Sequence, residues 1–215
     1  MAKWPARWPA RKSRRSTSPA TVRLPRRCAP SLEAANAEIY QTAQGRSELR
    51  GMGTTAVAFA ITSSHGWLAY VGDSRLYLIR RGQIYRMSED HSMVFEMVHK
   101  GLITAEEARN HADRNVLSRA LGSRPQVDVS CWDEPFPIQA GDRFLLCSDG
   151  LHDLVTDENM LALARDGDLN VATERLVRTA NENGGYDNIS VILLEAVDAK
   201  ALRGRPGPTR EYQVP

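Results

Sequence analysis

The chain has 215 residues, of which 42% are hydrophobic and 25% charged, the ordinary balance of one globular domain with a sizeable core. No stretch reaches the ~18 apolar residues of a membrane span, and three cysteines without a CxxC spacing argue against a disulfide framework and against a zinc site. We therefore expect a cytoplasmic protein that is not bound to a membrane.

The first thirty residues differ in charge from those that follow. Residues 1–30 hold nine Lys or Arg, five prolines and no acid, whereas residues 31–198 hold 15 basic and 25 acidic residues. We expect 1–30 to be a disordered basic segment and 199–215, rich in Gly and Pro, to be a disordered tail. The acidic body suits metal sites and a basic peptide substrate, although a solvated acidic surface is commoner.

Three explanations stay open for residues 1–30. A nucleic-acid-binding arm is one, but aromatic residues are not interleaved beyond two Trp-Pro pairs, so we expect no nucleic-acid partner. A transit peptide, rich in Arg and Ser and poor in acids, is the second. The third is translation out of frame. Read two bases later, the junctions Trp4-Pro5 and Trp8-Pro9 both spell GCC, which encodes Ala, and Met1-Ala2 gives Gly.

Folded structure is expected from Ser31. Apolar residues at helical spacing predict a helix that ends near Gly51. Four closely spaced strands then follow without intervening helices, which indicates an antiparallel sheet. Their expected ranges are 55–62, 67–71, 75–80 and 83–87.

Residues 89–122 are predicted to form short helices laid over the sheet, at 93–100, 104–110 and 115–120. Strands return at 127–132 and 143–148, and two helices follow at 157–165 and 170–181. The last strand, 189–196, is almost wholly apolar and is expected to be central. The order of elements predicts an α+β fold, an antiparallel β-sandwich flanked by helices.

Three aspartates share one context, beside Gly or Asn at the end or start of an apolar strand. Asp73, Asp149 and Asp187 would each be costly to bury unless paired, hydrogen-bonded or metal-bound. Gathered at one rim they would suit Mg²⁺ or Mn²⁺. Each has a plain structural alternative, because Asp next to Gly is commonly a turn residue and Arg75 could be an ion-pair partner of Asp73. The five histidines show no ligand spacing, and we assign them no catalytic role.

Six motifs occur in one order along the chain. They are ELRGMGTT (48–55), VGDSR (71–75), EDHS (89–92), RNVL (114–117), GDRFLLCSDGL (141–151) and GYDNISV (185–191). This series resembles the bacterial metal-dependent (PPM-type) serine/threonine protein phosphatases of type 2C, over about residues 32–197. The resemblance implies a type 2C phosphatase-like domain at 31–198, with a mobile flap at 89–122 where substrates are selected.

The resemblance also implies roles for the three aspartates. Asp149 and Asp187 resemble catalytic ligands of a binuclear Mn²⁺ or Mg²⁺ centre, and Asp73 resembles the ligand of a third, weaker metal ion. Two adjacent cations lower the pKa of a bridging water, which then attacks phosphorus in line. The implied partners are phosphoprotein substrates, together with a cognate Ser/Thr kinase and its targets. We expect a monomer.

Two further acidic motifs of the family, Arg-x-x-Asn-x-Asp and Asp-Gly-Met-Gly-Gly, do not occur before Ser31. The domain is therefore expected to be N-terminally incomplete, without its first strands, with weakened metal binding and impaired hydrolysis of phosphoserine and phosphothreonine. The shifted frame of residues 1–30 resembles the Gly-Glu-x-Ala-Ser segment that follows the second motif, so we expect the missing ligands to be encoded upstream in that frame. The alternative function is a catalytically inactive pseudophosphatase that binds phosphoproteins or a kinase in signalling.

Overall fold

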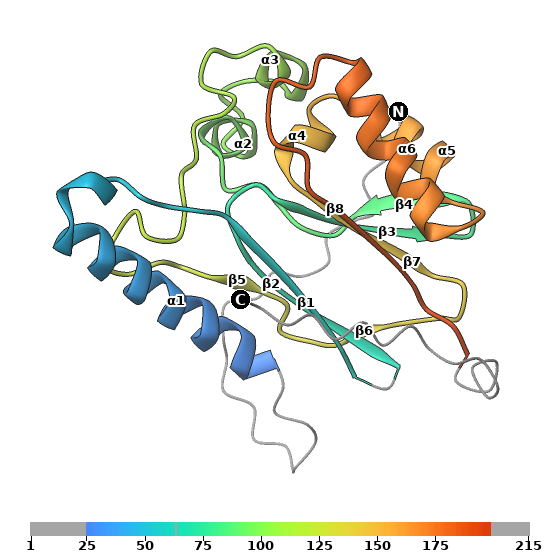
Figure 1. The fold of residues 1–215 in the computed structure, drawn as a ribbon, viewed down its shortest axis with the longest axis horizontal. Helices are drawn as coiled ribbons and strands as arrows, with labels where there is room; N and C mark the ends of the chain where they lie inside the picture. Colours follow the sequence, from blue (N-terminus) through green and yellow to red (C-terminus); the bar gives the residue numbers. More distant parts are fainter. Residues whose placement is uncertain (1–24, 63, 199–215) are drawn as a thin grey trace.

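The computed structural model describes residues 25–62 and 64–198, which form two antiparallel sheets packed face to face between helices (Figure 1). The expected disorder of residues 1–24 and 199–215 lies outside the described residues. The α+β sandwich expected from the sequence is confirmed. No helix among the described residues is long and apolar enough to cross a membrane.

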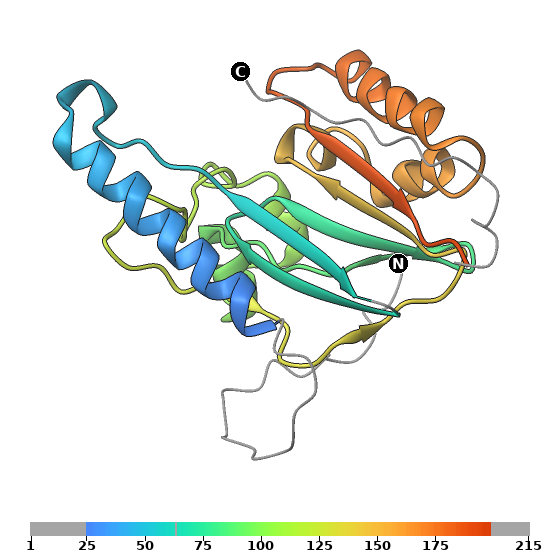
Figure 2. The ribbon, with the colours of Figure 1, turned by 60° about the horizontal axis from the view of Figure 1, so that its bottom comes forward.

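The first sheet has the strand order β1-β2-β5, and β6 also pairs with β2. Its strands are β1 (Ala56–Thr62), β2 (His65–Val71), β5 (Ser130–Cys131) and β6 (Phe136–Pro137). The outer face of this sheet is covered by α1 (Pro25–Gly45), which a short 3₁₀ turn, η1 (Ser47–Leu49), connects toward β1 (Figure 2).

The second sheet has the order β4-β3-β7-β8. Its strands are β3 (Arg75–Arg80), β4 (Gln83–Arg86), β7 (Arg143–Cys147) and β8 (Val191–Glu195). The turn between β3 and β4 has two residues, Arg81 and Gly82, both with positive φ (53° and 73°). Positive φ at both turn residues gives the turn a twist that matches the twist of the two flanking strands, as a two-residue hairpin requires.

Helices cover the outer face of the second sheet. They are α4 (Asp149–His152), α5 (Asp157–Ala164) and α6 (Leu169–Glu182). Between α6 and the sheet lies a core that includes Leu145, Leu176 and the thiol of Cys147. Burial raises the pKa of Cys147 to about 12. A separate core fills the space between the sheets, where Phe59 of β1 packs on Phe144 of β7 with ring centroids 4.6 Å apart.

Two helices form the first part of the segment expected to be a flap, α2 (Met93–His99) and α3 (Ala105–Arg109). Both have N-caps that the sequence signals: Ser92 accepts a hydrogen bond from Phe95 N at 3.3 Å, and Thr104 forms a capping box with Glu107. The helix expected at 115–120 does not form. Leu117 instead makes an antiparallel bridge with Ser92, because this stretch closes back along the start of α2.

Three other expectations need correction. The helix α1 begins at Pro25, within the segment 1–30 that we expected to be disordered. The strand expected at 127–132 is shortened to β5, and β6 was not predicted. The last strand, expected to be central because it is apolar, is β8, and among the described strands it pairs with β7 alone. An apolar sequence shows that a strand could be buried, but not which neighbours it has.

Candidate functional site

Four strand ends meet at one end of the sandwich, which we call the rim. The register pairs Ala56 with Val71, Arg75 with Cys147, and Cys147 with Val191. The turn between β2 and β3, the end of β7 and the start of β8 therefore lie together. Asp73, Asp149 and Asp187 belong to these three segments, as the sequence predicted for one rim.

The turn that carries Asp73 is fixed by close contact with the segment before β1. Gly72 has φ +102°, and a Cβ there would lie 2.3 Å from Cγ2 of Thr55. The hydroxyls of Thr55 and Ser74 share a hydrogen bond of 2.8 Å. A glycine is therefore required before Asp73, both for its φ angle and for the space.

Asp73 is partly buried, and its surroundings are negatively charged. Its carboxyl pKa is raised, first by burial and then by the negative charge of Asp149, while His152 acts in the opposite direction. His152 also donates from Nε2 to the backbone carbonyl of Asp73 over 3.1 Å. Two carboxylates that repel each other across a partly buried space are suited to share a cation.

Asp149 opens α4 directly after β7. The backbone N–H of Gly150 donates to Asp149 Oδ1 at 3.0 Å, which fixes the orientation of the carboxylate. A Cβ on Gly150 would lie 2.4 Å from the carbonyl oxygen of Asn188. The Ser-Asp-Gly sequence therefore lets the start of α4 touch the chain that precedes β8.

Asp187 lies on that adjoining segment. Asn188 N donates to Asp187 Oδ1 at 2.6 Å, and the hydroxyl of Ser148 donates to Asn188 O at 3.1 Å. Ser190 N donates to the same hydroxyl at 3.0 Å. The segments of Asp149 and Asp187 are thus hydrogen-bonded neighbours, and close approach of the two carboxylates stays a prediction.

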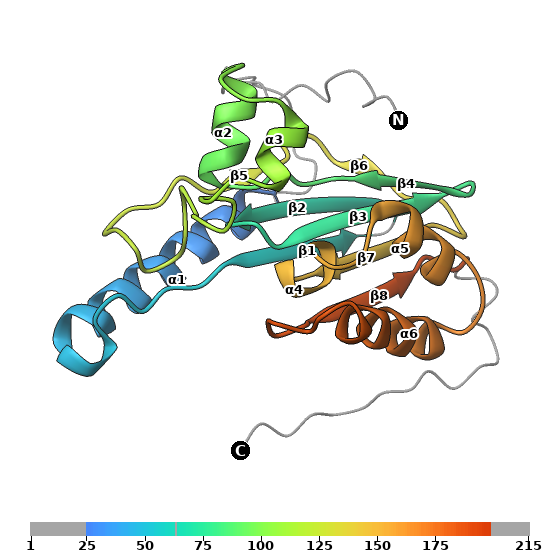
Figure 3. The same cartoon turned by 90° about the horizontal axis from the view of Figure 1, so that it is seen from above.

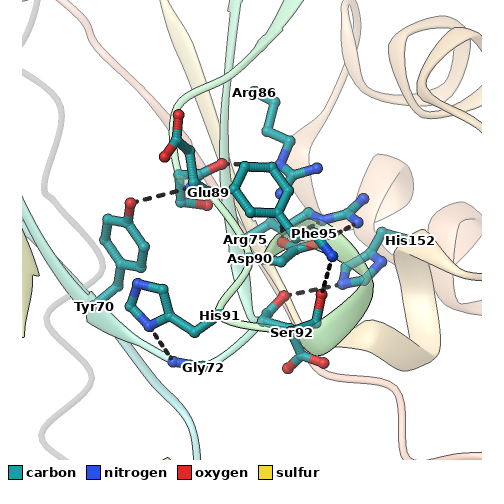
Figure 4. Close-up of polar contacts among 12 residues, drawn as sticks. Tyr70, Gly72, Arg75, Arg86, Glu89, Asp90, His91, Ser92, Phe95 and His152 are labelled. Carbon is teal, nitrogen blue, oxygen red and sulfur yellow. Dashed lines mark hydrogen bonds and ion pairs between the residues drawn. The ribbon is translucent and has the colours of Figure 1, made fainter. Parts of the chain in front are cut away.

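An ion-pair cluster lies next to the rim, at the start of β3 (Figure 4). Arg75 binds Asp90 through two hydrogen bonds, Nε to Oδ1 at 3.0 Å and Nη2 to Oδ2 at 2.7 Å. Arg86 approaches the same carboxylate at 2.6 Å, and Arg75 Nη1 donates to the hydroxyl of Tyr77 at 2.9 Å. The sequence suggested Asp73 as the partner of Arg75, but the two guanidinium groups hold Asp90 instead. They lower the pKa of Asp90 against the opposing effect of burial.

His91 joins the start of the flap to the Asp73 turn. Its side chain is buried, and its Nδ1 accepts a hydrogen bond from Gly72 N at 3.0 Å. The other ring nitrogen, Nε2, lies 2.9 Å from Ser130 Oγ, and the ring stacks on Tyr70 with centroids 5.0 Å apart. Burial and the positive charge of Arg119 lower the pKa of His91 to about 4, so the ring is neutral at physiological pH. Because Nδ1 accepts, Nε2 carries the proton.

A small pocket of about 170 Å³ opens beside this histidine, between α2 and the segments that carry Ser118 and Ser130. Its wall contains Arg119, which donates to the backbone oxygen of Asp128 at 3.0 Å and to Ser130 Oγ at 3.2 Å. Acidic side chains from residues 89–96 line the same pocket, together with Lys100. Its charge is therefore mixed.

The rim fits a divalent cation in the chemistry of its donors. The negative charge of Asp149 raises the pKa of Asp73, and the backbone N–H groups of Gly150 and Asn188 each donate to one carboxylate oxygen of the preceding aspartate. Within residues 25–62 and 64–198, however, no three His, Cys, Asp or Glu side chains are close enough to hold a metal ion by themselves. Further oxygen ligands, such as water, would be needed there.

Sequence reasoning missed His91, His152 and Asp90. No ligand spacing marked either histidine, and their contacts bridge residues far apart in sequence. The one available signal was that Asp90 and His91 lie inside the EDHS motif.

Comparison with known proteins agrees with the fold. The family model "Protein phosphatase 2C" matches residues 5–96. The serine/threonine phosphatase Stp of Listeria monocytogenes is 39% identical over 166 residues, which cover 77% of this chain and 65% of that protein. The chain therefore spans slightly less than two thirds of this curated relative.

Solved structures give the same result. The crystal structure of the Mycobacterium tuberculosis serine/threonine phosphatase PstP/Ppp superposes with a TM-score of 0.77 at 34% identity, covering 81% of this chain and 73% of that one. The catalytic domain of PstP in complex with two manganese ions has a TM-score of 0.72 at 32% identity, covering 84% and 74%. Stp1 of Staphylococcus aureus has a TM-score of 0.75 at 30% identity, covering 85% and 72%.

Proposed function

The chain belongs to the protein phosphatase 2C (PPM-type) family of serine/threonine phosphatases, and from this premise we propose that it hydrolyses phosphoserine and phosphothreonine in proteins in a metal-dependent reaction. The observation that carries the proposal is the pair of hydrogen bonds through Ser148 that joins the segment of Asp149 to the segment of Asp187, next to the partly buried Asp73. A site of this kind favours a hard cation bound to oxygen.

Each aspartate has a separate role in the proposal. Asp149 and Asp187 would hold the catalytic metal ions, and Asp73 would bind a third, weaker one. Mn²⁺ or Mg²⁺ bound here would lower the pKa of a bound water, and the cations would neutralise the charge of the phosphate. The chain contributes orientation: the N–H groups of Gly150 and Asn188 fix the two carboxylates, and His152 holds the turn of Asp73 through its backbone oxygen.

The substrates would be phosphoproteins, among them a cognate Ser/Thr kinase and its targets, in the cytoplasm. Residues 89–122 would contact the protein part of the substrate as a flap. Support for this role comes from the short helices α2 and α3 and from the pocket between α2 and Ser130, both beside the anchored residues 89–92.

Activity of the 215 residues as printed would be weak, because the sequence contains no Asp-Gly-Met-Gly-Gly motif to bridge two cations. The same observation supports the second candidate, a pseudophosphatase that binds phosphoproteins or a kinase without hydrolysis. The surrounding fold would remain able to present the flap in either case.

The test measures Mn²⁺-dependent phosphate release from a phosphothreonine peptide, together with binding of that peptide, for the natural chain and for Asp149→Asn. Weak release that requires Mn²⁺ and falls at least tenfold in Asp149→Asn supports the phosphatase. A matched control, Asp166→Asn, changes a carboxylate that is 79% exposed, pairs with Arg165 at 2.8 Å and is assigned no metal, so it should retain most of the activity.

Release that is equal with and without Mn²⁺, or equal in Asp149→Asn, would contradict the proposed reaction. Peptide binding without any release at saturating Mn²⁺ would favour the pseudophosphatase.

A further inference from the structure

The backbone that leads to Asp73 lies beyond the end of the sheet pairing. The last residue pair of β1 and β2 is Ala56 with Val71, and β3 begins at Arg75. Gly72 is buried, so the polar groups of its backbone need partners inside the protein. The strand ladder does not supply them at this position. They come instead from a residue 19 positions later in the sequence.

His91 supplies both partners. Its backbone N–H donates to the carbonyl oxygen of Gly72 at 3.0 Å, and its ring Nδ1 accepts from the N–H of Gly72, also at 3.0 Å (Figure 4). The two bonds hold the peptide units on either side of Gly72, and the second of these units ends at the nitrogen of Asp73. His91 therefore fixes the backbone from which the side chain of Asp73 extends.

His91 also lies where the two ends of the flap are joined. Ser118 N donates to His91 O at 2.8 Å, and Met93 N donates to Val116 O at 2.9 Å. The chain between Met93 and Val116 forms α2 and α3, which lie next to the end of β2 at the rim (Figure 3). A displacement of these two helices therefore acts directly on the backbone of His91.

The far side of the His91 ring reaches the residue that follows this pairing. Nε2 donates to Ser130 Oγ at 2.9 Å, and Arg119 Nη1 donates to the same hydroxyl at 3.2 Å. Consecutive hydrogen bonds thus connect Arg119 through the ring to Gly72. The ring is 2% exposed and stacks on Tyr70, so it has little room to turn away from these partners.

We propose that His91 is a positioning residue that couples the flap to Asp73. Displacement of the flap ends moves the ring, and the ring moves the turn that carries the carboxylate. A substrate that contacts the flap thereby changes how Asp73 binds a cation, and by linkage the cation changes the mobility of the flap. His91 itself contacts neither of them. The inference rests on the proposed function only in taking Asp73 as a metal ligand.

Two substitutions of His91 separate this role from a purely structural one. Asparagine places an oxygen where Nδ1 lies, so it keeps the acceptor for Gly72 N but loses the contact with Ser130. Glutamine places its amide where Nε2 lies, so it keeps the contact with Ser130 and loses the acceptor for Gly72 N. Both variants lose the ring that stacks on Tyr70, and both should therefore lower stability to a similar extent.

The first measurement is exchange of the Gly72 amide proton, followed by NMR on the full chain without metal. In His91→Gln this exchange should be about tenfold faster than in the natural chain, because one buried hydrogen bond is lost. In His91→Asn it should stay close to the natural rate. Equal exchange in the two variants would mean that His91 only fills space, and would overturn the proposal.

The second measurement tests the coupling without changing the ring. Arg119→Gln should shift the amide signals of Gly72 and Asp73 in the natural chain, and these shifts should shrink in His91→Gln, where the path is broken. Signals that do not respond to Arg119→Gln would overturn the proposal, whether or not the His91 variants fold. Shifts of the same size with and without the imidazole would overturn it as well.

A titration with Mn²⁺ distinguishes this inference from the proposed function. Mn²⁺ bound by Asp73 should broaden the amide signals of its turn, at a higher Mn²⁺ concentration in His91→Gln than in His91→Asn. Equal midpoints in the two variants would contradict the positioning of Asp73. If the natural chain shows no broadening there, the third metal ion of the proposed function is wrong, and the two metal-free measurements still decide the role of His91.

Discussion

The rim and the open edge of the second sheet at β8 differ in how many contacts their side chains make within the described chain. At the rim, Asp90 and His91 are buried polar groups with partners inside the chain. On β8, the apolar side chains of Ile192 and Leu194 are 56% and 37% exposed. The rim is thus organised by contacts between described residues, whereas this face of β8 has few such contacts. Changes at the rim should therefore lower folding stability more than changes on this face of β8.

The largest effect is expected for Asp90→Ala. The substitution leaves Arg75 and Arg86, each with a side chain only 16% exposed, without their shared carboxylate. Removing one partner of a buried ion pair costs about 3–5 kcal/mol, so the free energy of unfolding in urea should fall by that amount. Asp113→Ala is the control, because its carboxylate is 62% exposed and lies 3.8 Å from His111. A loss below about 1 kcal/mol for Asp90→Ala would show that the cluster does not hold the rim.

A smaller effect is expected for Leu146→Ala and Ile192→Ala, which compare β7 directly with β8. The two residues are paired on one face, but Leu146 is 8% exposed and Ile192 is 56% exposed. In dilute solution Leu146→Ala should cost about 2–4 kcal/mol of unfolding free energy, and Ile192→Ala less than about 1 kcal/mol. Equal losses of unfolding free energy would mean that the face of β8 that carries Ile192 is covered within one chain.

The smallest effect concerns pH and His91. In the unfolded chain this imidazole binds a proton below about pH 6.5, while in the folded chain its pKa is lowered to about 4 by burial and by Arg119. The unfolded state therefore gains protons first as pH falls. The contribution of His91 is complete above pH ~6.5 and is lost between there and pH ~4. Urea midpoints of the natural chain should fall more steeply over this window than those of His91→Gln. Parallel pH profiles would mean that His91 is protonated without cost in the folded state.

Local signals in the sequence were sufficient for several elements. The hairpin of β3 and β4 follows from two apolar runs around Arg81 and Gly82, and the N-caps Ser92 and Thr104 mark the starts of α2 and α3. Asp73, Asp149 and Asp187 were placed at one end because each adjoins an apolar strand. For the hairpin and the caps the deciding interactions lie within a few residues, whereas the three aspartates meet through the long-range pairing of β3 with β7 and of β7 with β8.

Long-range contacts decided what the sequence could not. Residues 115–120 were predicted to be helical, but Leu117 pairs with Ser92 in an isolated bridge and no helix forms there. Arg75 had a charged neighbour two residues away, yet it binds Asp90, which the β3–β4 hairpin brings to it. The apolar run of β8 indicated burial, but in the structure Ile192 and Leu194, on one face of this strand, are 56% and 37% exposed.

The hairpin turn at Arg81 and Gly82 also bears on the order of events during folding. A two-residue turn of this geometry closes within microseconds, whereas pairing β3 with β7 must join Arg75 to Cys147 across a long loop. The hairpin brings Asp90 to Arg75, only 15 positions away, without waiting for that slower pairing. The support beneath Asp73 can therefore assemble early from one continuous stretch of chain, and the strands that carry Asp149 and Asp187 would add to a base that already exists.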